Sequence, residues 1–368
     1  MPNIKSSISP LLTTFVILMA LLLAACSENA PERKLKVGRD YLKYSDDTRE
    51  SWSSNDARPL ITTIWYPTMS TAKEKLWQVA IFNAGWSALG SPILEPKQPY
   101  PLVVLSHGTG GAAMQMSWFA EHLASNGYVV AAVNHHGNTA AEDALLPQGF
   151  ALWWERARDL SVVIDKLLVD DRFARFIDPK RIALAGFSLG GYSVVSSVGG
   201  ITDLSKKNEF CSRNSDNPIC VLPPEAGMTM AEAVTVLEAD AKATASFERS
   251  GKSYKDARVK AVFAIAPVHG PAFTAESLKE VDIPVSFVVG SHDKQAPAED
   301  NAKLLADSIN NSTFEELKDV SHYTFLSRCN KRGQQFVPEL CGDNKNIIRA
   351  DVHKSVSEKA RLFFEKHL

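Results

Sequence analysis

Five short apolar runs, separated by segments of helical periodicity, constrain the fold of this chain more than any other sequence feature. Each run is rich in Val, Ile, Ala or Phe and shows little alternation of apolar with polar residues. This pattern is typical of strands buried on both faces of a parallel sheet. Strands that alternate with helices predict an α/β fold with right-handed crossovers. The runs are Leu102–Ser106, Tyr128–Asn134, Arg181–Gly186, Lys260–Ala266 and Val285–Gly290.

Helical patterns lie between these runs and complete one large domain, predicted over residues 35–368. Met116–Ser125 and Glu155–Val169 have helical character, and Asp351–Leu368 is predicted as a terminal helix that covers the sheet. We therefore expect a mostly parallel central sheet with helices on both faces. Two further strand-like runs precede the alternating part, around Leu35–Tyr44 and Leu60–Tyr66.

The charge of the chain is balanced, with 40 Lys and Arg against 42 Asp and Glu and a formal net charge of −2. This balance gives no electrostatic reason to expect a nucleic-acid partner. With 45% apolar residues among 368, the composition excludes collagen-like and disordered chains and allows a large core.

The first residues have the composition of an export signal. Lys5 precedes the apolar run Leu11–Leu23, which is too short for a comfortable membrane span. Small residues directly before Cys26 resemble a bacterial lipoprotein box, in which the Cys becomes the lipidated first residue. We expect residues 1–25 to be a cleaved signal peptide and residues 26–34 to be a lipidated tether.

The predicted lipid anchor implies a place in the cell envelope. Ser27 follows Cys26, which by resemblance to sorting rules favours the outer membrane, facing the periplasm. Several acyl chains would hold the protein firmly, because one chain alone binds a membrane only marginally. The alternative is an ordinary signal peptide and a soluble secreted or periplasmic protein.

The cysteine count agrees with export. Four cysteines remain besides Cys26, an even number in a chain predicted to reach an oxidising compartment. Four cysteines allow three connectivities. We favour the pairing of sequence neighbours, which closes two short loops, Cys211 with Cys220 and Cys329 with Cys341.

One long stretch, residues 199–258, interrupts the alternation of strands and helices. Connections of this length carry function or have their own structure. A helix is predicted from Met230, because Thr229 and Glu232 match a capping box. We interpret the stretch as a helical cap over the carboxyl edge of the sheet, and the alternative is a peripheral decoration held by a disulfide.

The main chemical signal is a Gly-X-Ser-X-Gly pattern at residues 186–190, with Ser188 at its centre. It follows a predicted strand and precedes Tyr192–Ser197, which can begin a helix. A nucleophilic serine must stand on such a sharp turn, where glycines let neighbouring backbone pass without Cβ clashes. Ser188 is therefore predicted as a nucleophile, the alternative being a structural Gly-Ser turn.

A serine hydroxyl needs a base to take its proton. We predict His322 as this base, because it lies between a strand-like segment and the terminal helix, where a loop can place its imidazole near Ser188. His269 follows a strand end and can line a pocket. His353 and His367 belong to the terminal helix and are expected at the surface.

The base in turn needs an orienting carboxylate. Asp293 is favoured, because it follows the end of a buried strand, where its carboxylate faces the crevice in which α/β enzymes bind ligands. Glu299, Asp300 and Asp319 remain as alternatives. The segment after the preceding predicted strand, residues 266–270, offers no carboxylate.

Negative charge on a tetrahedral intermediate requires preorganised donors. The backbone N–H of Leu189 is predicted as one donor and that of Thr109, in the Gly-rich segment Ser106–Gly111, as the second. His107 is interpreted as a hydrogen-bonding brace for this segment, with direct participation in catalysis as the alternative.

Other signals are weaker. His135 and His136 end a strand, but two adjacent histidines without a clear carboxylate partner make a poor metal site, so no metal is expected. No Gly-rich phosphate cradle is present, and no cofactor is expected. Trp153 and Trp154 are assigned to core packing rather than to substrate contact.

Together these motifs resemble the α/β-hydrolase fold and, more narrowly, dienelactone-hydrolase-like proteins related to platelet-activating-factor acetylhydrolases. The resemblance covers most of residues 35–330. It implies a serine hydrolase with Ser188, Asp293 and His322 as catalytic triad. The motifs that carry it are Val37-Gly38, Ile64–Pro67, Ser106–Gly111, Trp154–Leu160, Gly186–Gly191, Gly290–Asp293 and His322–Phe325.

The chain departs from both groups in one respect each. True dienelactone hydrolases use a Cys nucleophile, where this chain has Ser188, and the acetylhydrolases take their acid after the earlier strand. Both departures weaken what the resemblance implies about the substrate, and they leave the implied reaction class unchanged. The sequence thus predicts a carboxylic ester hydrolase for small-molecule or lipid esters. The alternatives are a phospholipid, acetyl-ester or polyester hydrolase, and a non-catalytic envelope binding protein; oligomeric state is not predicted.

Overall fold

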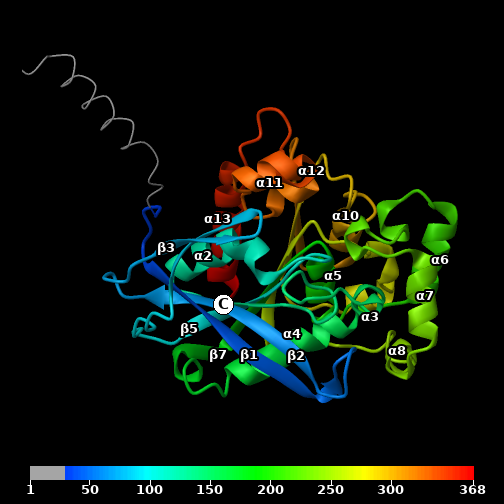
Figure 1. Cartoon of the computed structure of the whole chain (residues 1–368), viewed down its shortest axis with the longest axis horizontal. Helices are drawn as coiled ribbons and strands as arrows, with labels where there is room; N and C mark the ends of the chain where they lie inside the picture. Colours follow the sequence, from blue (N-terminus) through cyan, green and yellow to red (C-terminus); the bar gives the residue numbers. More distant parts are fainter. Residues whose placement is uncertain (1–29) are drawn as a thin grey trace, which may run out of the picture. The chain divides into compact units, whose positions relative to one another are not determined.

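A mixed sheet of ten strands forms the centre of the protein in the computed structural model, which describes residues 30–368 (Figure 1). The spatial order of the strands is β10-β9-β8-β7-β5-β6-β2-β1-β4-β3. Their bounds are β1 Lys36–Glu50, β2 Ala57–Thr68, β3 Lys75–Val79, β4 Phe82–Leu89, β5 Tyr100–Ser106, β6 Val129–Val133, β7 Ile177–Phe187, β8 Val259–Ile265, β9 Val285–Gly290 and β10 Ser312–Leu317.

The six strands from β10 to β6 pair in parallel, whereas β2 runs antiparallel to both β6 and β1. Every residue of β5, β6 and β9 is buried, as expected for strands covered on both faces. All five apolar runs of the sequence are strands of this parallel part. The predicted α/β architecture is therefore confirmed.

Helices cover both faces of the sheet. The chain moves from β5 through α2 to the neighbour β6, and then returns through α4 to β7 on the other side of β5. Because both crossovers are right-handed and run in opposite directions, α2 and α4 lie on opposite faces. The helices are α2 Ser117–Ser125, α3 Pro147–Ala151, α4 Glu155–Leu167, α5 Leu189–Ser196, α6 Leu204–Arg213, α7 Met230–Glu238, α8 Ala241–Phe247, α9 Ala275–Lys279, α10 Ala302–Ser308, α11 Lys331–Phe336, α12 Pro338–Cys341 and α13 Arg349–His367.

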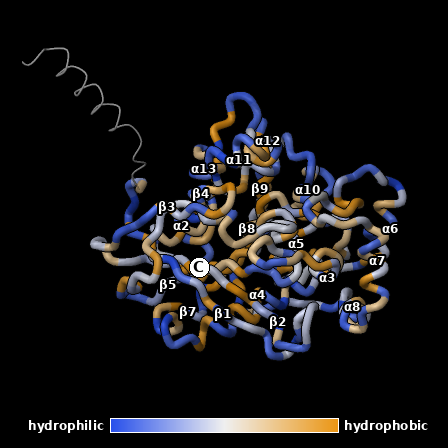
Figure 2. The backbone as a smooth tube through the Cα atoms, in the orientation of Figure 1, coloured by the Kyte–Doolittle hydropathy of each residue, from blue (hydrophilic) through white to orange (hydrophobic). Residues whose placement is uncertain are grey.

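The core lies between the sheet and these helices. In α4 the side chains of Leu160, Val163, Ile164 and Leu167 are fully buried, and each contributes about 1.5–3 kcal/mol by leaving water. The terminal helix α13 packs on α2, and α5 packs on α4. In Figure 2, segments of hydrophobic residues lie mainly in the interior, and segments of hydrophilic residues lie mainly in the outer loops.

The long connection between β7 and β8 is helical. Beyond α5 it contains α6, α7 and α8, which Figure 1 shows gathered at one end of the folded unit, and α7 packs on α3 and α8. The predicted capping box is present, since Thr229 N–H donates to Glu232 Oε2 at 2.7 Å and Glu232 N–H donates to Thr229 Oγ1 at 3.2 Å. The helix accordingly starts at Met230.

The predicted N-terminal segments fall largely outside the described residues. The signal peptide over residues 1–25 and the lipidated Cys26 lie outside them, as do residues 27–29 of the tether. The folded unit begins at Arg33, whose guanidinium donates to the Trp86 carbonyl at 3.0 Å and pairs with Glu121. The extent of the tether, predicted over residues 26–34, stays a prediction. Within residues 30–368, no helix has the length and apolar character that a membrane span requires.

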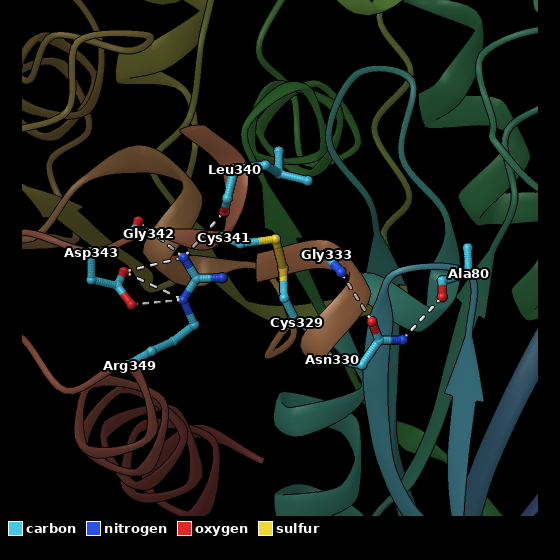
Figure 3. The surroundings of a disulfide bond; sticks show 9 residues. All are labelled: Ala80, Cys329, Asn330, Gly333, Leu340, Cys341, Gly342, Asp343 and Arg349. Carbon is cyan, nitrogen blue, oxygen red and sulfur yellow. Dashed lines mark hydrogen bonds and ion pairs between the residues drawn. A yellow bond between two sulfur atoms is a disulfide. The ribbon is translucent and has the colours of Figure 1, made fainter. Parts of the chain in front are cut away.

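Both disulfides between sequence neighbours are present. Cys211 in α6 joins Cys220, and Cys329 joins Cys341 across α11 and α12. Figure 3 shows how the second bridge is surrounded: Arg349 from α13 donates to the carbonyls of Leu340 and Gly342 and pairs with Asp343. The bridge therefore closes a loop that α13 already holds at one end.

Removal of the bridge by the double change Cys329→Ala and Cys341→Ala is expected to lower the free energy of unfolding by about 2–4 kcal/mol. The unfolded chain then regains the entropy of an unclosed loop. Denaturant unfolding measures the loss. The bridge between Cys211 and Cys220 closes a loop of similar length. The matched double variant at these two cysteines is therefore expected to lose a similar free energy of unfolding. An unchanged midpoint for both variants would contradict a stabilising role.

Candidate active site

Ser188 stands on a sharp turn between β7 and α5, with a backbone φ of 56°. The turn brings chain segments too close for side chains. A Cβ on Gly186 would lie 2.1 Å from the Gly190 carbonyl oxygen, and a Cβ on Gly190 would lie 1.9 Å from the Ser106 carbonyl oxygen. Glycine at both positions is therefore a steric requirement of the turn.

The change Gly190→Ala is expected to lower the free energy of unfolding by about 3 kcal/mol or more, because the new methyl group overlaps the Ser106 carbonyl at the end of β5. Thermal and denaturant unfolding measure this loss. Gly251→Ala is the matched control, since its Cβ would meet only the Thr202 oxygen at an ordinary 3.5 Å. Equal stability of the two variants would contradict the steric argument.

Ser188, His322 and Asp293 form a hydrogen-bonded chain. Ser188 Oγ lies 3.0 Å from His322 Nε2, and His322 Nδ1 lies 2.6 Å from Asp293 Oδ2. The backbone N–H groups of Gln295 and Ala296 donate to the other carboxylate oxygen of Asp293 at 3.0 and 2.7 Å, which fixes its orientation. The side chains of Ser188, His322 and Asp293 are all buried. This arrangement can move a proton from the hydroxyl to the imidazole.

The alternative acids lie elsewhere. Asp300 accepts a hydrogen bond from Asn217 at 2.8 Å, Asp319 lies 3.5 Å from the exposed His292, and Glu299 is exposed. The structure thus brings only Asp293, among the acids considered, into contact with His322.

The other histidines have different surroundings. His269 lines the cavity beside Ser188, where its ring stacks on Trp153 at 4.3 Å between centroids. The expected surface position of His353 was wrong. His353 is buried, stacks on Trp118 at 4.1 Å and donates to the Thr324 carbonyl at 2.8 Å, because it lies on the face of α13 that packs on α2. His367 is partly exposed.

The two predicted oxyanion donors border the same cavity. Thr109 and Leu189 both line it, and neither backbone N–H donates to another residue within the described chain, 30–368. Side chains hold the loop around Thr109 in place: Asn138 Oδ1 accepts from Gly110 N–H at 2.5 Å, and Asn134 Oδ1 accepts from Ala113 N–H at 2.9 Å. Two free donors next to Ser188 can stabilise negative charge.

His107 is bonded as a brace. Its Nδ1–H donates to the Gly108 carbonyl at 2.7 Å, and its Nε2 accepts from His135 N–H at 3.1 Å. Burial lowers the pKa of His107 well below its ordinary value, so the ring is neutral and can both donate and accept. Arg156, which the sequence analysis did not single out as a site residue, donates to the His107 carbonyl from α4.

The adjacent histidines do have carboxylate partners, contrary to the sequence-based expectation. His135 Nδ1 lies 2.9 Å from Asp159, and His136 Nδ1 lies 2.8 Å from Glu142. The contact of His135 joins residues 24 apart in sequence, whereas Glu142 lies only 6 residues after His136 and was overlooked as a partner. In the described part of the chain, no three His, Cys, Asp or Glu residues gather as a metal-binding group. Trp153 and Trp154 are buried, in agreement with core packing.

The cavity at Ser188 has a volume of about 210 Å³. Its walls combine apolar residues, with Phe150, Phe187 and Leu326 among them, and polar residues such as Gln115 and Glu225. The segment 218–225 of the long insertion contributes one wall, and Tyr323, next to His322, donates to Glu225 of this segment at 2.9 Å. The insertion is therefore part of the cavity rather than a distant decoration.

Comparison with known proteins places the chain in a fold class. A ferulic acid esterase from Streptomyces cinnamoneus superposes with a TM-score of 0.62 over 92% of both chains, at 21% sequence identity. With the parallel sheet, the serine turn after β7 and the helices on both faces, this likeness shows that the chain has the α/β-hydrolase fold.

Sequence matches are shorter. Residues 62–151 match the family Platelet-activating factor acetylhydrolase, isoform II, and residues 114–205 match the Prolyl oligopeptidase family. Cutinase est2 of Thermobifida alba is 30% identical over 28% of this chain and 32% of its own length. Lipase 1 of Moraxella sp. (strain TA144) is 32% identical over 21% of this chain and 20% of its own. The chain thus spans about a third or less of these two curated relatives.

Proposed function

We propose that the protein is a serine-dependent carboxylic ester hydrolase that works through an acyl-enzyme intermediate. The observation that carries the proposal is the hydrogen-bonded chain Ser188–His322–Asp293 at the wall of a cavity with apolar side chains in its lining. Partial sequence matches to a cutinase and a lipase support the same reaction class.

The geometry suits two successive acyl transfers. Ser188 Oγ attacks the ester carbonyl carbon while His322 Nε2 takes the hydroxyl proton, and the resulting oxyanion faces the N–H groups of Leu189 and Thr109. His322 then gives the proton to the departing alkoxide, which leaves as the alcohol. Water next attacks the acyl-enzyme, His322 takes its proton and returns it to Ser188 Oγ, and the carboxylic acid departs. Asp293 holds the imidazole and stabilises its charged form.

The cavity favours a small acyl group. Pockets for drug-sized ligands occupy about 300–1,000 Å³, and the cavity here is smaller, about 210 Å³. We infer acetyl and butyryl esters as the preferred substrates. The match to the acetylhydrolase family over residues 62–151 supports an acetyl ester as a specific candidate.

We further infer that the enzyme is exported and anchored in the cell envelope through lipidated Cys26. Two disulfides and the small residues before Cys26 support this location. Mass spectrometry of the membrane-bound protein tests it, since a diacylglyceryl-modified Cys26 would be the first residue. An unmodified N-terminus cut elsewhere would indicate an ordinary signal peptide instead.

Labelling with a fluorophosphonate tests the activity. We expect one phosphonyl group on Ser188, found by peptide mass spectrometry, because only a serine with an activating base reacts readily. A panel of nitrophenyl esters should then show the highest kcat/KM for acetyl or butyryl groups and a decline at octanoyl. Absence of both labelling and turnover would favour a non-catalytic binding protein.

A further inference from the structure

A second cavity, of about 270 Å³, lies where the turn between β1 and β2 meets α4 and α8. It shares no lining residue with the cavity at Ser188. Its lining is strongly cationic, with Glu50 as the only carboxylate among the residues that form it. The basic residues of this lining are Arg49, Arg58, Arg158, Lys242 and Arg249.

Carboxylates neutralise most of these cations but not all of them. Arg49 contacts Asp46, Glu155 and Asp159, and Arg58 also contacts Asp159, at 2.9 Å. Lys242 pairs with Glu50 at 2.9 Å, and Arg249 shares Glu155 at 2.7 Å. Five cations therefore face four carboxylates, counted over the residues that the structure describes.

Arg158 is the cation left over. Its one hydrogen bond within residues 30–368 goes to Thr48 Oγ1 at 3.2 Å, and it forms no ion pair there. Partial burial and the neighbouring charge of Arg49 lower the pKa of Arg158 below its ordinary value. An anion beside Arg158 would relieve this repulsion.

Several N–H donors of the lining residues also have no acceptor. Arg58 is 2% exposed, and its Nη1 is buried without a hydrogen-bond partner in the described chain. The same holds for Arg249 Nε and Trp52 Nε1. A buried donor without an acceptor costs about 1–3 kcal/mol, and an unobserved ion or water is a common explanation.

We propose that this cavity binds a phosphate group, either free or carried by an organic monoester. Planar guanidinium groups match the oxygens of phosphate, and several line this cavity, among which Arg158 forms no ion pair within residues 30–368. The indole of Trp52, over which Arg58 lies at 5.1 Å, adds an apolar wall suited to the organic part of such a ligand. The proposal does not depend on esterase activity, since none of these residues touches Ser188, Asp293 or His322.

Calorimetric titration of the full chain tests the site, with inorganic phosphate in one arm and glycerol 3-phosphate in the other. We expect saturable binding that weakens at least about tenfold in Arg158→Gln, because the change removes a cation without breaking an ion pair. Arg213→Gln is the matched control, since Arg213 is exposed in α6 and pairs only with Glu209. Tighter binding of glycerol 3-phosphate identifies an organic phosphate as the ligand, and equal binding identifies free phosphate.

Two results would overturn the proposal. One is the absence of saturable binding of either compound, and the other is an equal affinity of Arg158→Gln and Arg213→Gln, which would place the anion elsewhere, for example at the free N–H groups beside Ser188. If Arg158→Gln does not fold, the affinity of Lys242→Gln for phosphate tests the proposal instead. Loss of Lys242 leaves Glu50 unpaired at the cavity, so the affinity for phosphate should fall as well.

Discussion

Replacement of Ser188 by Ala is expected to lower kcat/KM for nitrophenyl acetate by about 10⁴-fold or more. The variant loses the only atom that can form the acyl-enzyme, so the remaining turnover would come from water held near the free N–H groups of Leu189 and Thr109. The fold should persist, because the one side-chain hydrogen bond of Ser188 Oγ within residues 30–368 is the bond with His322. Steady-state kinetics and circular dichroism measure the two effects separately.

Ser197→Ala provides the matched control for this prediction. Ser197 is the C-cap of α5, is also buried, and its hydroxyl donates to the Ser193 carbonyl at 2.9 Å as its one hydrogen bond in the described chain. This variant should retain nearly full activity with a small loss of stability. Turnover that persists in Ser188→Ala, or an equal loss in both variants, would refute the nucleophile assignment.

Features governed by short-range patterns could be predicted from the sequence. The parallel strands were predicted because burial on both faces requires continuous apolar runs, and the serine turn because two glycines must pass within contact of neighbouring backbone. The capping box at Thr229 is equally local. Each of these signals lies within a dozen residues of the chain.

Features that depend on contacts between distant segments could not be predicted. The hairpin of β3 and β4 at the sheet edge went unnoticed, because its strands are only partly buried and lack a clear apolar pattern. The bond from Arg156 to the His107 carbonyl joins α4 to the loop after β5. The burial of His353 is an exception, because helical spacing places it on one face of α13 with the buried Val356, Ala360 and Phe364, a signal that the prediction overlooked.

The role of the insertion is another feature that could not be predicted from the sequence. Its length and capping box were visible in the sequence, but its role as a cavity wall depends on the short segment 218–225 and on the contact of Glu225 with Tyr323. Glu225 belongs to no motif, and the motif His322–Phe325 does not reveal the contact that its Tyr323 makes. The volume available to an acyl group is therefore set by residues whose function only the folded structure reveals.

The change Asp293→Asn should be nearly as harmful as loss of the nucleophile, with kcat lowered by about 10³–10⁴-fold. An asparagine that keeps the bonds from Gln295 and Ala296 presents its NH₂ group to His322 Nδ1. The imidazole must then carry its proton on Nε2, where it faces Ser188 Oγ and cannot accept a proton.

The matched control is Asp319→Asn, which removes the same charge close to His322 in sequence. Asp319 is half-exposed, faces His292, and has a φ of 61° that asparagine tolerates well, so both stability and kcat should change little. KM for short esters should remain similar in both variants, because neither side chain lines the cavity. A loss of kcat in Asp319→Asn that matches Asp293→Asn would mean that general charge near the imidazole, rather than one oriented hydrogen bond, supports the reaction.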